Sequence, residues 1–183
     1  MWLNQTINPI TIMKITQEQK NDLEKLYQSL LHNEKIMRMK DIPMHRGSNC
    51  YEHCFTVAKK AIKLCESPLK KNIDLETVIL GAILHDYYLY DWRVDSSKRK
   101  GHGRKHQYIA AENASRDFEI SMEVKKVIES HMWPLNFHEY PKSKEAKIVS
   151  IVDKMVTLRQ ALTTHKHKEN RREHYLAYIS HLF

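Results

Sequence analysis

Glycine and proline are scarce in this sequence: its 183 residues include four glycines and five prolines. Folds built from many tight turns need more of both, because these residues supply the backbone conformations of most turns. The scarcity also leaves little material for flexible linkers. No segment shows the strict alternation of apolar and polar residues that indicates a strand. The composition therefore predicts an all-α protein.

Long apolar runs are also missing. No stretch approaches the ~20 apolar residues that span a bilayer. Residues 1–12 are mildly apolar but lack the basic start and small-residue cleavage site of a signal peptide. Met13, followed by Lys14, is a second candidate for the initiator, and the sequence leaves that choice open. We expect no membrane partner.

Cysteine is limited to Cys50, Cys54 and Cys65. An odd number of cysteines without an export signal is typical of free thiols in a reducing compartment, so we expect a cytoplasmic protein. The spacing falls on or near one stripe of a helix, which favours small core residues. A structural zinc site formed by Cys50, His53 and Cys54 is the alternative, although no second Cys/His pair stands at a suitable distance.

Acidic residues are outnumbered, 22 against 30 basic ones, which gives a formal charge of +8. A basic balance favours phosphate-bearing partners without singling out nucleic acid. Basic residues cluster at 98–105 and again at 166–172. No nucleic-acid-binding motif with interleaved aromatic residues accompanies them, so we expect a small phosphorylated substrate.

The apolar periodicity and capping residues predict about seven helices in one domain, 1–183. The expected helices span about 16–39, 49–65, 74–86, 106–118, 121–131, 141–162 and 169–182. The segments 41–48 and 87–103 are predicted loops. The last helix is amphipathic and could pack within its own chain or against a partner, so a homo-oligomer is one possible outcome.

The dyad His85-Asp86 ends the apolar run 78–84. Neighbouring residues on a helix point about 100° apart, so the two side chains can serve one metal only at a helix end or an irregularity. An unpaired polar group in a core costs ~1–3 kcal/mol, and a lone charge costs far more. A bound metal would explain the pair.

Other residues of ligand type lie near apolar residues at helical spacing. His53 and Asp153 could complete, with the dyad, one octahedral nitrogen and oxygen site with two open positions, which suits Fe, Mn, Co or Ni. His106 and His131 could hold a second ion if Asp86 bridges the two. His102 competes with His106, but His102 lies in a Gly-His-Gly segment that is typical of a flexible loop, whereas His106 heads a predicted helix.

The order of these residues resembles that of the HD-domain superfamily of metal-dependent phosphohydrolases. The resemblance covers about 49–162 and rests on five motifs in register. These are Tyr51-Glu52-His53, Gly81-Ala82-Ile83-Leu84-His85-Asp86, His106 with Ala110 and Ala111, Glu129-Ser130-His131, and Ile151-Val152-Asp153-Lys154.

The resemblance implies a helical fold and a metal held by His53, His85, Asp86 and Asp153. In two-metal branches of the superfamily, further histidines stand where His106 and His131 do. The layout is similar to that of bacterial HD hydrolases that cleave diadenosine tetraphosphate. This chain departs from those enzymes at 132–134, where it has Met-Trp-Pro instead of a Thr and Gly after the histidine. It also has Tyr-Tyr-Leu-Tyr-Asp-Trp at 87–92, where many HD proteins place a Lys a few residues after the dyad.

We therefore predict a phosphohydrolase that uses a metal-activated water, with Asp86, His106 and His131 as catalytic residues. Substrate phosphates need further cations. The candidates are Arg46, Arg93, Arg104 and Lys154. Trp92, Tyr88 or Trp133 could stack on a base, which contributes ~1–3 kcal/mol, although core burial is the stronger interpretation of Trp133. The alternatives are an HD-type di-iron oxygenase and a non-catalytic module that binds nucleotides or nucleic acid.

Overall fold

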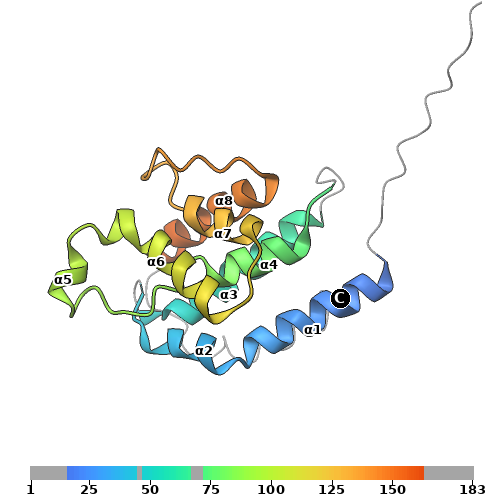
Figure 1. The fold of residues 1–183 in the computed structure, drawn as a ribbon, viewed down its shortest axis with the longest axis horizontal. Helices are drawn as coiled ribbons and strands as arrows, with labels where there is room; N and C mark the ends of the chain where they lie inside the picture. The colour runs from blue at the N-terminus through green and yellow to red at the C-terminus, as the bar shows by residue number, and fades with distance from the viewer. Residues whose placement is uncertain (1–15, 45–46, 67–71, 163–183) are drawn as a thin grey trace, which may run out of the picture.

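The computed structural model describes residues 16–44, 47–66 and 72–162. Every regular element in these ranges is helical, with eight α-helices and one short 3-10 helix, which confirms the predicted all-α class. The helices form a bundle, with α1 extending away from it along one edge and α5 projecting at the opposite end (Figure 1). No helix in these ranges is long and apolar enough to cross a membrane.

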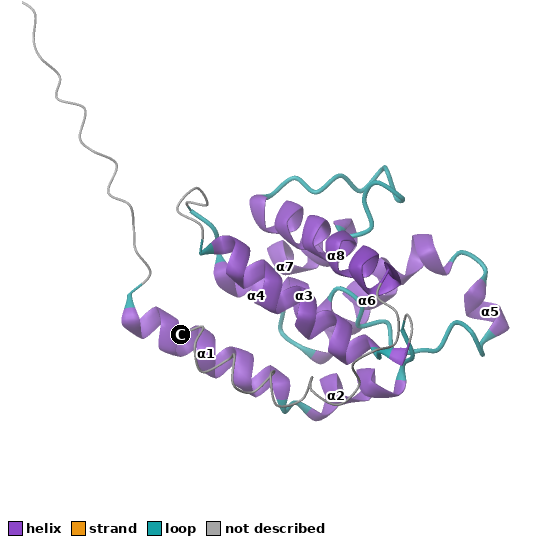
Figure 2. Cartoon of the chain, turned by 180° about the vertical axis from the view of Figure 1, so that it is seen from behind, coloured by secondary structure: helices purple, strands orange, loops and turns teal. Residues whose placement is uncertain are grey.

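The centre of the bundle is formed by α3 (Cys50–Cys65), α4 (Leu75–Leu84), α7 (Met122–Ser130) and α8 (Lys144–Leu162). α4 contacts the other three helices and is apolar on nearly all of its surface, as a helix surrounded by protein must be. Viewed from behind, α3 and α4 cross the middle of the molecule beside α8 (Figure 2).

The starts of the central helices were predictable from their capping residues. The side chain of Asn49 accepts a hydrogen bond from the backbone N–H of Glu52, and that of Ser121 accepts one from Val124. Asp74 caps α4 in the same way. These short polar side chains satisfy N–H groups that the first helical turn leaves without partners. The predicted start at Pro141 is three residues early, because α8 begins at Lys144.

The predicted continuous helix 16–39 is wrong. α1 (Gln17–Leu31) begins with the expected capping box at Thr16, but it ends before Asn33. The side chain of Asn33 accepts hydrogen bonds from the backbone N–H groups of Lys35 and Ile36 and starts α2 (Glu34–Met37). A 3-10 helix, Arg38–Asp41, completes the segment. An asparagine side chain thus competes with the backbone for helical hydrogen bonds and breaks the helix.

The prediction of a loop from 87 to 103 is also wrong in part. Asp95 caps a short helix, α5 (Ser96–Arg99), and α6 (His102–Asp117) begins four residues before His106. Gly101 precedes α6 with φ at 85°, a conformation that glycine adopts without steric cost. His106 therefore lies in the second turn of α6. The predicted helix 169–182 lies outside the described residues.

Candidate metal centre

All six predicted ligand residues converge on one buried site. His53 lies on α3, His106 on α6 and Asp153 on α8. The dyad follows the end of α4, and His131 follows the end of α7. Each of the six side chains belongs to a residue that is at most 6% exposed. The site is thus assembled from five helices, most of which form the centre of the bundle.

The end of α4 explains how adjacent residues can face one site. α4 ends at Leu84, and the backbone N–H of Tyr87 donates to the carbonyl of Leu84 in a tighter turn. Departure from regular helix lets His85 and Asp86 turn toward each other, with Nε2 and Oδ2 3.4 Å apart. The dyad thus stands at a helix end, the position that shared metal binding requires.

The Asp86 carboxylate stands between two groups of histidines. Its Oδ1 lies 3.2 Å from Nε2 of His106 and 3.6 Å from Nε2 of His131. Its Oδ2 faces Nε2 of His85 and, at 3.9 Å, Nε2 of His53. A carboxylate whose two oxygens face different ligand groups has the position that a bridging ligand needs.

Asp153 closes the group around His53 and His85. Its Oδ1 lies 3.1 Å from Nε2 of His53 and 3.6 Å from Nε2 of His85. Ligand atoms within 4.8 Å of one another include the set His53, His85 and Asp86 and the set Asp86, His106 and His131. Both sets could hold a metal ion, and Asp86 belongs to each of them.

Hydrogen bonds from Nδ1 fix the orientation of the imidazoles. Nδ1 of His85 lies 2.8 Å from the carbonyl oxygen of Ala82, and Nδ1 of His131 lies 2.7 Å from that of Ile128. Nδ1 of His106 is 2.8 Å from the carbonyl oxygen of His102. A carbonyl oxygen only accepts, so each Nδ1 must carry the hydrogen, and in the neutral ring Nε2 presents a lone pair. Such bonds are typical of metal-ligating histidines.

These lone pairs leave polar atoms in the core that a cation would satisfy. Nε2 of His106 and Nε2 of His131 face each other at 3.1 Å, although neither nitrogen of this pair carries a hydrogen when both rings are neutral. Nε2 of His85 and Oδ1 of Asp86 are buried without a hydrogen-bond partner. Buried polar atoms without partners are costly. The residues present therefore fit a divalent metal of nitrogen and oxygen preference.

Electrostatics favours the protonation states that a metal needs. Burial alone would raise the pKa of Asp86, but the charge of His85 and the close contact with His106 outweigh it and hold the pKa well below its usual value. Burial and, next, the nearby charge of His85 lower the pKa of His131 to about 3. Asp86 is thus an anion and His131 a neutral imidazole at neutral pH.

His85 carries the compensating positive charge when no metal does so. Burial lowers the pKa of His85, but the neighbouring Cys54 and Asp86 and the close approach of Asp153 raise it well above its usual value. Two buried carboxylates thus attract one positive charge to this position. A proton and a metal ion compete for it.

Several residues that hydrogen-bond to the candidate ligands were not predicted from the sequence. Gln160 accepts a hydrogen bond from Nδ1 of His53 at 3.0 Å, and Thr157 donates to Asp153. Ser150 donates to the carbonyl of His131 at 2.9 Å. Gln160 and Thr157 follow Asp153 by seven and four residues and share its helix face, but this spacing does not predict the contact of Gln160 with His53 on another helix.

His102 lies behind His106. The two rings stack with centroids 4.7 Å apart, and Nδ1 of His102 lies 2.9 Å from the hydroxyl of Tyr90. Trp92 stacks against His102 at 5.2 Å. Of the two competing histidines, only His106 has a nitrogen within 4 Å of Asp86 in the described contacts. The geometry therefore favours His106 as the ligand and gives His102 a supporting position.

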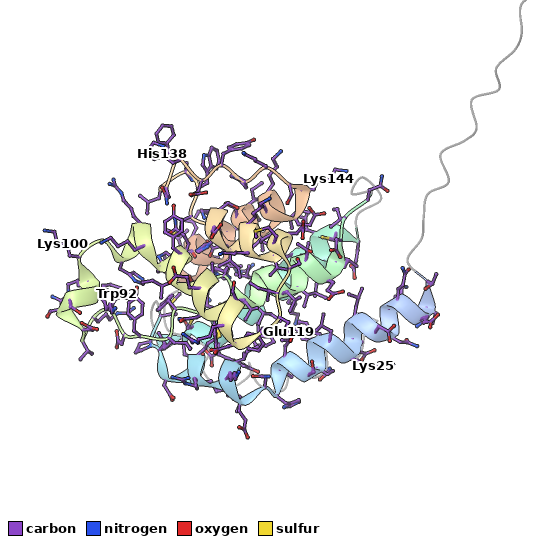
Figure 3. The ribbon with its side chains drawn as sticks, in the orientation of Figure 1. Lys25, Trp92, Lys100, Glu119, His138 and Lys144 are labelled. Carbon is purple, nitrogen blue, oxygen red and sulfur yellow. The ribbon has the colours of Figure 1, made fainter. Side chains whose placement is uncertain are left out.

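The predicted substrate residues have different surroundings. Arg93 donates to the carbonyls of Pro43 and Met44, and its guanidinium lies 4.7 Å from the centre of the Trp92 ring. The Trp92 ring is therefore in contact with both Arg93 and His102. Trp92 lies at the end of the molecule that carries α5 and Lys100 (Figure 3).

Arg104 is exposed on the first turn of α6. Lys154 donates to the carbonyl of His131 and lies 3.3 Å from the Asp153 carboxylate. Trp133 is partly exposed and packs edge-on against Tyr140, so its predicted core burial is only partial. Arg46 lies outside the described residues.

The cysteines agree with the prediction of small core residues. Cys50 and Cys54 are fully buried, and Cys65 is half-buried. Cys50 donates through Sγ to the backbone carbonyl of Asp86 at 3.2 Å. The alternative zinc site is not favoured, because His53 directs Nε2 to Asp153.

Fold and site together define an all-α protein with a buried histidine and aspartate centre that could hold metal ions. The HD domain family matches residues 50–158, more than half of the chain. The chain belongs to this family, which lies in a superfamily of metal-dependent phosphohydrolases. No curated protein and no solved structure gives a significant match.

Proposed function

We propose that this protein is a metal-dependent phosphohydrolase that cleaves a nucleotide or a related small phosphoester or phosphoanhydride. One observation carries the proposal. Four imidazoles and two carboxylates meet in the core, and the Nδ1 hydrogen bonds aim the Nε2 lone pairs at the carboxylates. Membership of the HD family supports the same chemistry.

In this proposal the residues have distinct tasks. His53, His85, Asp86 and Asp153 hold one ion. His106 and His131, with Asp86, hold a second ion or contact the substrate phosphate. A bound metal supplies an acidified water and polarises the phosphoryl oxygen. Asp86 orients the attacking water, because its two oxygens face both histidine groups.

A phosphate substrate would find cations beside the centre. Lys154 lies next to Asp153, and the basic stretch 98–105 occupies the start of α6 and the helix before it. Arg93 would have to exchange its backbone hydrogen bonds for a phosphate. A base that stacks on Trp92 would compete with Arg93 and His102 for the ring. Lys154 would likewise have to release the carbonyl of His131, so we infer that Arg104, which is exposed, is the more accessible phosphate partner.

The decisive experiment begins with elemental analysis of anaerobically purified protein. Nucleotides, including diadenosine tetraphosphate, and simple phosphoesters are then screened with the metal that the analysis finds. Asp86→Ala should abolish turnover while the protein still folds in excess metal. Asp22→Ala on the exposed face of α1 is the matched control. Full phosphatase activity in Asp86→Ala would refute the proposal.

The same preparation separates the alternatives. Hydrolysis needs no dioxygen, so turnover under anaerobic conditions argues against a di-iron oxygenase. Strongly salt-dependent RNA binding without hydrolysis would instead indicate a binding module.

A further inference from the structure

The outer face of α8 carries a row of exposed apolar side chains. Ile151, Met155, Leu158 and Leu162 are 56%, 63%, 61% and 73% exposed. The last three border a shallow depression of about 500 Å³. The opposite face of the helix is buried in the core, so α8 is apolar on both sides. Contiguous exposed apolar surface of this kind usually marks a contact site.

The spacing of this row shows what kind of contact it suits. Successive members are separated by four, three and four residues. This alternation is the heptad spacing of a helix that packs along another helix. Scattered exposed residues on a solvated face would not keep it. The row therefore suits a second helix that runs along α8.

The chain itself continues from this row with a matching pattern. Leu162 is the last described residue, and 21 further residues follow it. Tyr175, Ile179 and Leu182 are separated by four and three residues, the spacing of one helical seam. From Leu158 back to Ile151 the steps are three and four residues, and from Tyr175 to Leu182 they are four and three, so the two rows have the same total length and stay within one residue of each other.

We propose that residues 169–182 form a helix that packs antiparallel on the exposed face of α8 within the same chain. The reversed register pairs Leu158 with Tyr175, Met155 with Ile179, and Ile151 with Leu182. Each pair has nearly the same sum of residue numbers, as an antiparallel register requires.

Length and tethering favour this occupant over a second copy. Six residues, 163–168, separate the two helices, and connections of 2–8 residues are common between helices in bundles. They need to bridge only the ~8–10 Å between packed helix axes. A short flexible tether also raises the effective concentration of the segment to about the millimolar range. A second copy at micromolar concentration competes poorly.

Cysteine pairs test the register directly in the full-length protein. In a Cys65→Ser background, Met155→Cys is combined with Ile179→Cys. We expect mild oxidation to link the two within one chain, seen as a monomer whose mass falls by two hydrogens, because facing residues meet the Cα separation of ~4.4–6.8 Å for a disulfide. The linked fraction should not depend on protein concentration.

The matched control moves one cysteine to the far side of the tail. Met155→Cys with Ala177→Cys should link at least about tenfold more slowly, because Ala177 lies roughly 160° around the helix from Ile179. Disulfide-linked dimers of the first pair would overturn the proposal in favour of a second copy. Equal rates for both pairs, or no linkage in the first pair, would overturn it as well.

A stability measurement provides an independent readout. Met155→Ser and Ile179→Ser should each lower the melting temperature, by about 3 °C or more, and the double variant should lose less than the sum of the two. Ala177→Ser should leave it nearly unchanged. If the face of α8 is uncovered, Met155→Ser should leave the melting temperature unchanged, because serine would then replace a methionine that is already exposed to solvent. Additive or absent losses would contradict the contact.

Discussion

At the scale of single residues, each imidazole of the centre is oriented by a hydrogen bond at Nδ1, on the side away from the carboxylates. The Nδ1 of His85 is tied to Ala82, and that of His53 to Gln160. Ring orientation is therefore set before any ion arrives, and fewer side-chain rotations are lost on binding. Neutral lone pairs and buried carboxylates would be a poor core without a cation.

Replacing a histidine of one group should remove a different metal ion from replacing a histidine of the other group. His131 contacts Asp86 but lies in a different set of ligand atoms from His53. We expect His131→Gln to keep the ion held by His53, His85 and Asp153 and to lose the second one. His53→Gln should weaken the first ion. Metal content by mass spectrometry checks this, and identical stoichiometry in the parent and both variants would contradict a two-ion centre.

Metal binding should release protons in a direction that the pKa values fix. The pKa of His85 is raised well above its usual value, so without metal this ring is protonated at neutral pH. A protonated nitrogen cannot bind a metal, so affinity should rise as pH rises toward the pKa of His85 and fall in acid. Calorimetry in buffers of different ionisation enthalpy should show about one proton released at pH 7 on binding of the ion that His85 holds.

The variant His85→Gln provides the control for that measurement. Its amide does not titrate, so proton release should fall toward zero and the remaining affinity should lose much of its pH dependence. Unchanged proton release in this variant would assign the titrating group elsewhere.

At the scale of elements, close packing of α4 on α7 places the dyad. Gly81 approaches α7 so closely that a Cβ atom would stand 2.5 Å from Cγ1 of Val127. Gly81→Ala must therefore separate the two helices or twist a β-branched side chain, at a cost of ~1–3 kcal/mol. Urea unfolding measures the loss, and Val127→Ala in the same chain should recover part of it.

Gly103→Ala in α6 is the matched control for Gly81. An added Cβ there would lie 3.6 Å from Leu135, an ordinary contact. Alanine is the better helix former, so this change should stabilise the protein by ~0.5–1 kcal/mol. Equal changes in stability at the two glycines would show that helix propensity, rather than the close approach of α4 to α7, determines the effect of Gly81→Ala.

The same scale shows which structural features were predictable from sequence. Capping residues such as Asn49 and Ser121 indicate helix starts, because their side chains bond to N–H groups of the first turn, so those starts were predicted correctly. Asn33 uses the same chemistry inside an apolar pattern that continues across it, so the break was missed. The start of α6 at His102 was not predicted, because the glycines on either side of it have low helix propensity. Packing outweighs that propensity in the folded protein.

The ligand set was predictable for a different reason. His85 and Asp86 stood out because apolar surroundings make a polar pair costly, and the other ligands followed in register. Gln160 and His102 gave no such signal, since an amide or an imidazole at a partly exposed position is ordinary. Their roles arise from contacts between distant segments, and spacing along one helix does not encode those contacts.

At the scale of the whole molecule, the centre links helices that are far apart in sequence. An ion held by α3, α4 and α8 binds only when these helices are packed, so it stabilises the folded state by mass action. Free metal at 100 times its dissociation constant contributes about 2.7 kcal/mol. For a chain of this size, that corresponds to roughly 5–10 °C in melting temperature.

A chelator should therefore lower the melting temperature of the metal-loaded protein by that amount, and re-adding the metal should restore it. The variant Asp86→Asn removes the carboxylate shared by both ligand sets while keeping its volume. Its melting temperature should respond little to chelator, because the ion it loses contributes nothing to its folded state. Asp22→Asn on α1 should respond like the parent. A chelator effect of equal size in Asp86→Asn would place the stabilising ion outside this centre, because a site elsewhere would not depend on the Asp86 carboxylate.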